Sequence, residues 1–229
     1  MICSLPPSAQ GRARACDMSL QYAPGQLSLP GLDRAPTDQL FFAIFPDALT
    51  AHRTAELAEG LRDACGLTGR PLGSRRFHVP LHDVGEYAGL PHDVVRKARE
   101  AASALAAAPF EIVFDHARSV ARKGGHAPLV LRGRSFEALV AFRAALADTL
   151  ARRGLRRPAR SFAPQMTLLY DACSITARAV EPVAWTVREF VLVHSRWGRT
   201  QHIALGRWPL REGRERIPRS TRSARRRSS

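Results

Sequence analysis

The sequence contains no asparagine, only two lysines (Lys97 and Lys123) and only four cysteines among its 229 residues. The cysteines lie far apart and form no C-x-x-C pair, which argues against a zinc site or a disulfide framework. No apolar run approaches the roughly 18 residues that span a membrane, and no apolar segment follows the first basic residues as in a secretory signal. We therefore expect a cytoplasmic protein with no membrane partner.

Positive charge dominates the sequence, with a formal net charge of +15 at pH 7. All but two of the 35 basic residues are arginine. Residues 211–229 hold eight arginines and two glutamates, or +6, and residues 1–38 balance three arginines with three aspartates, so residues 39–210 keep +9. Such an excess is typical of proteins that bind nucleic-acid phosphates. Scarce lysine and absent asparagine equally indicate a GC-rich coding bias, so charge alone leaves RNA binding a hypothesis.

The composition divides the chain into three regions. Residues 1–38 mix Pro, Ser, Gly and Gln without hydrophobic periodicity, which predicts a flexible extension. Residues 211–229 form an Arg/Ser-rich tail that cannot bury an apolar face, and we predict it to be disordered. Residues 39–210 carry regular apolar patterns and are predicted to form the folded domain.

Strand and helix patterns alternate along this domain. Amphipathic spacing predicts helices that begin near Thr50, near Pro91 and at Ser135, with Ser135 as an N-cap. Each half repeats the order strand, helix, polar strand, which predicts an α+β or α/β domain of two pseudo-repeated lobes. Apolar runs and alternation predict strands at residues 40–45, 76–81, 110–114, 129–131, 165–170, 185–193 and 202–208.

Two of these strands contain polar residues in an unusual arrangement. Residues 76–81 read RFHVPL, and residues 162–171 read FAPQMTLLYD. Since strand side chains alternate between faces, His78 should share a face with Pro80, and Gln165 should share a face with Thr167.

The two segments resemble the paired H-x-T motifs of the two-histidine phosphoesterases, which stand 87 residues apart here. The flanking sequence resembles the 2'-5' RNA ligase / RNA 2',3'-cyclic phosphodiesterase branch of that superfamily over residues 39–210. Residues 40–46 (LFFAIFP) resemble its first strand, and Gly85-Glu86 resemble the turn after its first motif. The segments at 190–195, 198–200 and 205–208 resemble its closing strands. The resemblance implies an α+β fold of two pseudo-symmetric βαβ-type lobes with a central cleft.

The resemblance also implies a chemistry. Opening a 2',3'-cyclic phosphate needs a base that activates water and an acid that protonates the departing ribose oxygen, and histidine suits both roles near neutral pH. Hydroxyls at the third motif position donate to the phosphate oxygens as negative charge develops. No metal or other cofactor is required. His78 and Thr167 are the catalytic candidates that this comparison gives.

This chain departs from the motif in each lobe. Pro80 stands where the first hydroxyl belongs, and Gln165 stands where the second histidine belongs. A glutamine amide cannot exchange a proton near pH 7, and losing one proton-transfer group usually lowers a rate by roughly 10²–10⁴. We therefore expect impaired hydrolysis of RNA or nucleotide 2',3'-cyclic phosphates. The alternatives are a catalytically inactive module that binds RNA ends or cyclic nucleotides, and a scaffold whose cleft has lost its role.

Four further residues are candidates for substrate binding. Phe45 and Tyr170 could stack on a base, or pack in the core with equal frequency, and Arg76 and Arg132 could contact phosphates. The ligands would be RNA ends or nucleotide cyclic phosphates, and the protein is expected to be a monomer.

Three other histidines are possible substitutes for the missing one. His82 could share the face of His78 if the strand continues, and His194 and His202 lie in the closing strands. A surface or hydrogen-bonded structural role is the favoured interpretation of all three. A metal site at His78 and His82 is disfavoured, because no carboxylate or cysteine cluster accompanies them.

Met18 is a candidate start of translation, because the residues before it carry no structural pattern. We expect peptide mass spectrometry of the native protein to find no peptide from residues 1–17. Recovery of such a peptide would refute this start.

Overall fold

The structure is a computed structural model that describes residues 35–121, 125–155, 162–198 and 201–211. The predicted N-terminal extension and basic tail therefore lie almost entirely outside the described residues. None of the described helices is long and apolar enough to cross a membrane.

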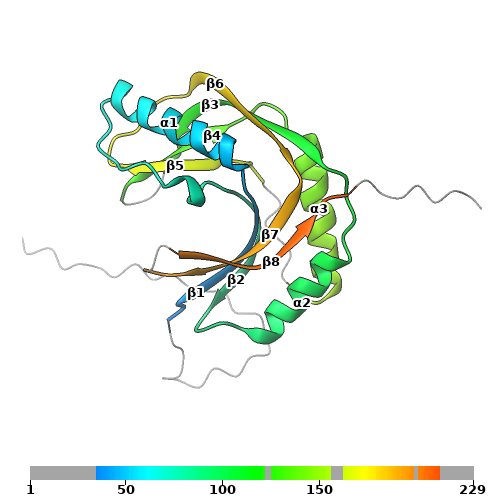
Figure 1. Cartoon of the computed structure of the whole chain (residues 1–229). Helices are drawn as coiled ribbons and strands as arrows, with labels where there is room; N and C mark the ends of the chain where they lie inside the picture. Colours follow the sequence, from blue (N-terminus) through cyan, green and yellow to red (C-terminus); the bar gives the residue numbers. More distant parts are fainter. Residues whose placement is uncertain (1–34, 122–124, 156–161, 199–200, 212–229) are drawn as a thin grey trace, which may run out of the picture. The chain divides into compact units, whose positions relative to one another are not determined.

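Eight strands form two four-stranded sheets, and every strand pair is antiparallel (Figure 1). Sheet A has the order β2 (Val79–Tyr87), β1 (Asp38–Ile44), β7 (Glu189–Arg196) and β8 (Gln201–Pro209). Sheet B has the order β5 (Met166–Asp171), β4 (Ala127–Arg132), β3 (Phe110–Ser119) and β6 (Arg178–Val187). The predicted α+β class is confirmed, although sheet A combines strands from the beginning and the end of the domain.

The helices are exchanged between the two halves of the chain. Helix α1 (Ala48–Ala64) packs on β5 and β6 of sheet B, whereas α2 (His92–Ser103) and α3 (Glu137–Arg152) pack on each other and against β8 and β2 of sheet A (Figure 1). Helix α3 also packs against β3 of sheet B. Each lobe thus takes a helix from the other half, so neither half can bury its apolar sheet face alone.

The two faces of sheet A separate by simple alternation along β1. Phe42 belongs to the main core, where its ring lies 6.0 Å from that of Phe190, which in turn lies 5.1 Å from Phe142 of α3. Phe41 and Ala43 belong to a separate cluster with residues of β7. We call the face that carries Phe41 and Ala43 the inner face of sheet A, because it points away from α2 and α3.

Local sequence signals position the start of α1 correctly. The carboxylate of Asp47 accepts hydrogen bonds from the backbone N–H and the hydroxyl of Thr50, both at 2.9 Å, and so caps the helix. The N-cap predicted at Ser135 is wrong, since α3 begins after Phe136 and no side chain caps it. The apolar contact of the Phe136 ring with Phe114, 5.2 Å between centroids, holds this end of the helix instead.

Three strand boundaries differ from the predictions. The strand predicted at 76–81 begins only at Val79, because Ser74–Arg76 form a 3₁₀ turn, η1. It then continues to Tyr87, so Gly85-Glu86 lie inside β2 and not in a turn. The backbone at Gly85 has φ +146°, next to a register shift in the pairing of β1 with β2, and glycine adopts this conformation without a steric clash. The single strand predicted at 185–193 is two, because the chain passes from sheet B to sheet A at Arg188.

Phe190 should be among the most sensitive core positions, because its fully buried ring contacts Phe42, Phe142 and Trp208. We expect Phe190→Ala to lower the free energy of unfolding by about 3–5 kcal/mol in urea titrations, through lost burial and a residual cavity. Leu49→Ala is the matched control, since Leu49 is 61% exposed and its loss should change stability by less than about 0.5 kcal/mol. Equal effects of the two substitutions would contradict this description of the core.

Candidate functional site

His78 lies on the inner face of sheet A, in the short segment between η1 and β2. Its ring centroid is 5.4 Å from that of Phe41 and 5.8 Å from that of Phe45. Pro80 pairs with Ala43 of β1, and directly paired residues project to the same face. His78 and Pro80 therefore share the inner face, as the strand alternation predicts.

The second motif lies at the start of β5. Thr167 pairs with Val130, a buried residue that stays outside the main core formed by its neighbours Leu129 and Leu131. Thr167 thus points to the face of sheet B that is opposite the main core. Gln165 stands two residues earlier, immediately before β5.

The two altered motif positions meet in one small pocket. Pro80 of β2 and Gln165 line a pocket of about 210 Å³ together with Asp83 and Phe162. The loss of a hydroxyl and the loss of an imidazole therefore affect the same region between the lobes. No described hydrogen bond joins His78 to Thr167, so their role as a catalytic pair stays a prediction.

Two of the other histidines are buried and do not contact His78 in any described interaction. A register shift between Phe42 and Ala43 places His82 opposite Phe42, so His82 is 2% exposed on the helix-covered face and does not share the face of His78. His194 is also buried, and its Nε2 forms a 2.5 Å contact with the carboxylate of Asp38. The structural interpretation is confirmed for His194 by this hydrogen bond, and for His82 it stays a prediction.

His202 is different, because β8 brings it to His78. The two ring centroids lie 5.0 Å apart with an interplanar angle of 88°, and the His202 ring is 5.7 Å from Phe41. Its neighbour Ala204 pairs with Val193 of the inner cluster, so alternation along β8 could have placed His202 on the inner face. The contact with His78 was beyond sequence reasoning, because it depends on how all four strands of sheet A are arranged.

The hydrogen bonding of His78 fixes its neutral tautomer. Its Nδ1 lies 2.7 Å from the carbonyl oxygen of Arg76 and must donate, because a carbonyl only accepts. The neutral ring therefore carries its proton on Nδ1 and leaves Nε2 as the basic nitrogen.

Burial and positive charge act together on both imidazoles. Burial lowers the pKa of His78 below its ordinary value, the hydrogen bond to the Arg76 carbonyl opposes that shift, and the Arg76 guanidinium adds to it. Burial, followed by the charges of His78 and Arg76, lowers the pKa of His202 to about 4. The Arg76 guanidinium is thus close enough to influence both rings.

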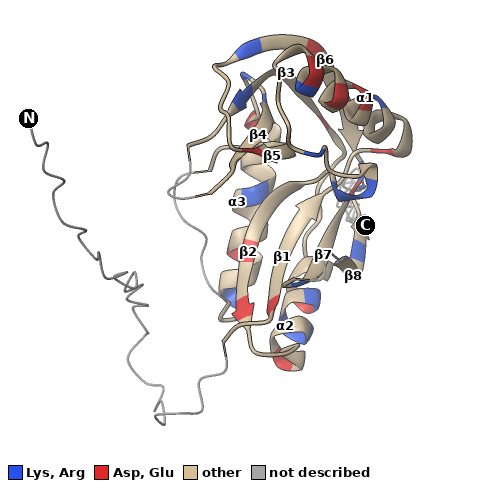
Figure 2. Ribbon diagram, turned by 90° about the vertical axis from the view of Figure 1, so that its left-hand side faces the viewer, with Lys and Arg blue, Asp and Glu red and all other residues tan. Residues whose placement is uncertain are grey.

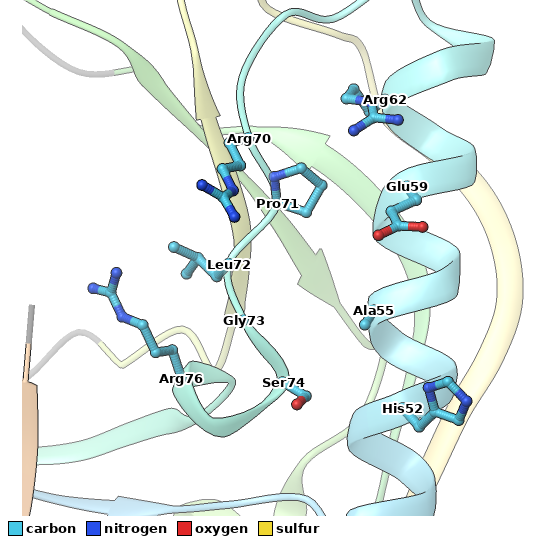
Figure 3. A pocket seen from close by; sticks show the side chains of 10 residues that line it. All are labelled: His52, Ala55, Glu59, Arg62, Arg70, Pro71, Leu72, Gly73, Ser74 and Arg76. Atoms are coloured by element: carbon cyan, nitrogen blue, oxygen red, sulfur yellow. The ribbon is translucent and has the colours of Figure 1, made fainter.

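The two arginines predicted to contact phosphate have unused donors. The Nε atoms of Arg76 and Arg132 are buried and have no hydrogen-bond partner within the described residues. Arg76 also lines a pocket of about 620 Å³ whose walls are α1 and the segment before η1, and Arg62 and Arg70 line the same pocket (Figure 3). An anion here would find several guanidinium groups, and phosphate contact by Arg76 and Arg132 stays a prediction.

A second pocket, of about 600 Å³, adjoins the histidine pair. Phe45, Trp185, Val193 and His202 line it, with Arg207 at its rim. The indole Nε1 of Trp185 is buried there without a hydrogen-bond partner in the described part of the chain. Tyr170, the other aromatic residue predicted to stack on a base, is instead 41% exposed on β5 opposite Pro128.

Two basic residues of α2 are neutralised by acidic neighbours on the same helix. On α2, Arg96 pairs with Asp93 and Glu100, and Lys97 pairs with Asp93 at 2.7 Å. Figure 2 shows this mixture of acidic and basic residues along the helix. Within the described ranges, no three His, Cys, Asp or Glu side chains lie together as a candidate metal-ligand set.

The sequence of the folded domain matches the profile of a known protein family. The sequence profile of the 2'-5' RNA ligase superfamily matches residues 45–199, well over half of the chain. The chain belongs to this superfamily. The match includes His78, Pro80, Gln165 and Thr167, so the altered motifs lie within a true family domain.

Solved structures of the 2'-5' RNA ligase superfamily and its relatives have the same fold. E. coli LigT with 3'-AMP is 26% identical, with a TM-score of 0.60 over 78% of this chain and 100% of LigT. A structure described as a phosphoesterase is 26% identical, with a TM-score of 0.59 over the same shares. TT0787 of Thermus thermophilus is 17% identical and shares the fold, with a TM-score of 0.62 over 76% of this chain and 99% of that chain. No protein of curated function matches the sequence.

Asp171, at the end of β5, connects the second motif to the loop before η1. Its carboxylate accepts backbone hydrogen bonds from Thr68 at 2.7 Å, Gly69 at 2.5 Å and Cys173 at 2.7 Å. These backbone donors, those of Cys173 and Gly69 first, hold the pKa of Asp171 below its ordinary value. The carboxylate thereby fixes the loop that leads to Arg76.

We expect Asp171→Asn to lower the urea midpoint at pH 7, because the asparagine amide has one accepting oxygen where the carboxylate has two. The NH₂ group that replaces the second oxygen would face a backbone N–H, and two donors cannot form a hydrogen bond. A depressed folded-state pKa stabilises the fold above the unfolded pKa, about 3.9, and this contribution is lost as pH falls through the folded value. The difference between wild type and Asp171→Asn should therefore shrink below pH 4. Asp148→Asn, on the exposed face of α3, is the control and should leave the midpoint unchanged at every pH.

Proposed function

We propose that the protein is an RNA 2',3'-cyclic phosphodiesterase with reduced turnover, which acts on the cyclic phosphate ends of RNA or nucleotides and leaves a 2'-phosphomonoester. Reversible 2'-5' ligation of RNA ends is the related activity that the family resemblance implies. The observation that carries the proposal is the His78 imidazole, which is anchored at Nδ1 by the Arg76 carbonyl and lies beside the Arg76 guanidinium. The ring supplies one of the two proton-transfer groups that phosphoester hydrolysis uses, and the cation supplies a charge that stabilises the phosphate oxygens.

Further support comes from the shape and chemistry of the surroundings. Phe45 and Trp185 line a pocket next to His78 that is large enough for a nucleoside. LigT, which is 26% identical, binds 3'-AMP in one of its structures. Other LigT structures hold ATP, NADP+ or phosphate. Nucleotides with terminal or cyclic phosphates are therefore the substrate class that we propose for this chain.

In the proposed reaction, the oxygen of a water molecule bonds to phosphorus and the bond from phosphorus to the ribose O3' breaks. His78 exchanges a proton with one of these oxygens through Nε2, and Thr167 together with Arg76 stabilises the phosphate oxygens. Gln165 cannot supply the second proton transfer, which accounts for the reduced rate.

The alternative function is a module that binds RNA ends or cyclic nucleotides without hydrolysing them. The altered positions Pro80 and Gln165 favour it, because both belong to one pocket and both remove chemistry from the site. Binding would then depend on the arginines and aromatic residues alone.

Hydrolysis of 2',3'-cyclic AMP by wild type, His78→Ala and Gln165→His separates the two functions. We expect slow wild-type turnover, a further loss of about 10²-fold or more in His78→Ala, and a gain in Gln165→His. The measurement is chromatographic separation of the 2'-phosphate product, with calorimetric binding of 2'-AMP in parallel. Persistent binding with no turnover by wild type would reject the enzyme and support the module.

A further inference from the structure

The site lacks a proton-transfer group at Gln165, yet it contains two imidazoles in contact. We propose that His202 is the second proton-transfer residue of this site and supplies from sheet A what the second motif no longer supplies from β5. This inference rests on the proposed hydrolysis of a cyclic phosphate.

The arrangement of sheet A brings the two rings together. His78 precedes β2 at one edge of the sheet, and His202 lies in β8 at the other edge. Both rings nevertheless contact Phe41 of β1 and lie 5.0 Å from each other. This contact requires an inner face that is concave, and Figure 1 shows the strong curvature of the sheet A strands. An inner face of this shape would allow both imidazoles to reach the same phosphate group of a bound nucleotide.

The hydrogen bonding of His202 suggests more than a packing role. Its Nδ1 is buried and has no hydrogen-bond partner among the described residues. A buried nitrogen without a partner lowers stability, whereas an apolar ring packed against Phe41 would not. A catalytic role is one of the explanations of such a group in a native structure, together with strain or a bound water or ion.

The charges around His202 indicate which of the two imidazoles is the general base and which is the general acid. The groups that face it across its pocket and from η1 are Asp47, Arg75, Arg76, Arg188, Glu189 and Arg207. Asp47 is engaged in capping α1, and Glu189 pairs with Arg207, so the remaining charge near the ring is positive. His202, with its pKa lowered to about 4, is neutral at pH 7 and suits the base. The hydrogen bond from Nδ1 to the Arg76 carbonyl favours the protonated form of His78, and a bound phosphate anion would favour that form further. His78 therefore suits the role of general acid.

The resulting step conserves protons and electron pairs. His202 removes one proton from water as its oxygen bonds to phosphorus, and the second proton stays on the new P–OH group. The bond from phosphorus to O3' breaks, and O3' takes a proton from Nε2 of His78. His202 is then protonated and His78 is neutral, and loss of one proton to solvent from His202 and gain of one from solvent by His78 restore the starting state.

Two substitutions of His202 test the proposal by initial-rate kinetics on 2',3'-cyclic AMP. His202→Gln removes the titratable ring, and His202→Phe keeps an aromatic ring against Phe41, which preserves the packing. We expect kcat to fall about 10²-fold or more in both, while KM changes by less than about threefold. His92→Gln, at an exposed position at the start of α2, is the control and should retain the wild-type rate.

The pH profile of kcat/KM is a readout that a purely structural role would not change. Both imidazole pKa values are lowered in the free protein, so the wild-type optimum should lie on the acid side of pH 6.5, with a falling acid limb near pH 4. The acid limb reports protonation of the base and should disappear in His202→Phe. Adding Gln165→His to His202→Phe should restore at least tenfold in rate, because it returns a proton-transfer group from β5.

The possible failures can be told apart. Wild-type turnover with an unchanged rate and profile in His202→Phe would overturn the role of His202 and leave the proposed function standing. Loss of activity in His202→Phe that Gln165→His fails to restore, in a variant with a wild-type thermal melt, would also overturn it. Absence of wild-type turnover would reject the hydrolase and the proton-transfer pair together.

Discussion

Alternation along the central strand β1 is the constraint on which the site depends. Phe42 and its even-numbered neighbours enter the main core beneath α3, so Phe41 and Ala43 are forced onto the opposite face. Because burial on the helix side strongly fixes the register of β1, the inner face is fixed with it. Phe41 then serves as the surface on which His78 and His202 both rest. Core packing and site geometry are consequently two results of the same alternation.

Burial on the inner face lowers the pKa values of both imidazoles. Removal from water disfavours the charged form of each ring, and the nearby Arg76 guanidinium adds repulsion. A phosphate anion would compensate for both effects, since it supplies the opposite charge in the same place. The free protein therefore has neutral rings and an unused guanidinium donor, and it is prepared electrostatically for an anionic ligand.

Much of the fold could be predicted from the sequence, because strand alternation and the apolar stripes of the helices are local signals. The two motif strands, the helix that follows Asp47 and the α+β class are examples. Errors arose where tertiary contacts override local signals: Phe136 replaces Ser135 at the start of α3, and the chain changes sheets at Arg188. For the site, the resemblance indicated His78, whereas Arg76 was one of two arginines expected to contact phosphate without support from the resemblance. Strand alternation correctly placed His78 and Pro80 on one face. His202 was named as a possible substitute, but a structural role was favoured, because its contact with His78 depends on the order of the four strands of sheet A, which no local pattern encodes.

The central position of β1 also has a consequence for how the chain folds. β1 pairs with β7, so that Asp38 lies opposite Arg196, and the strands of sheet B occupy most of the intervening sequence. During synthesis, all four strands of sheet B leave the ribosome before β7 and β8 are complete. Sheet A is therefore completed last, when β7 pairs with β1, the first strand to be synthesised. This pairing closes a long loop, and contacts of such large sequence separation form slowly. Until that moment the apolar residues of β1 depend on β2 and the helices alone for protection from aggregation.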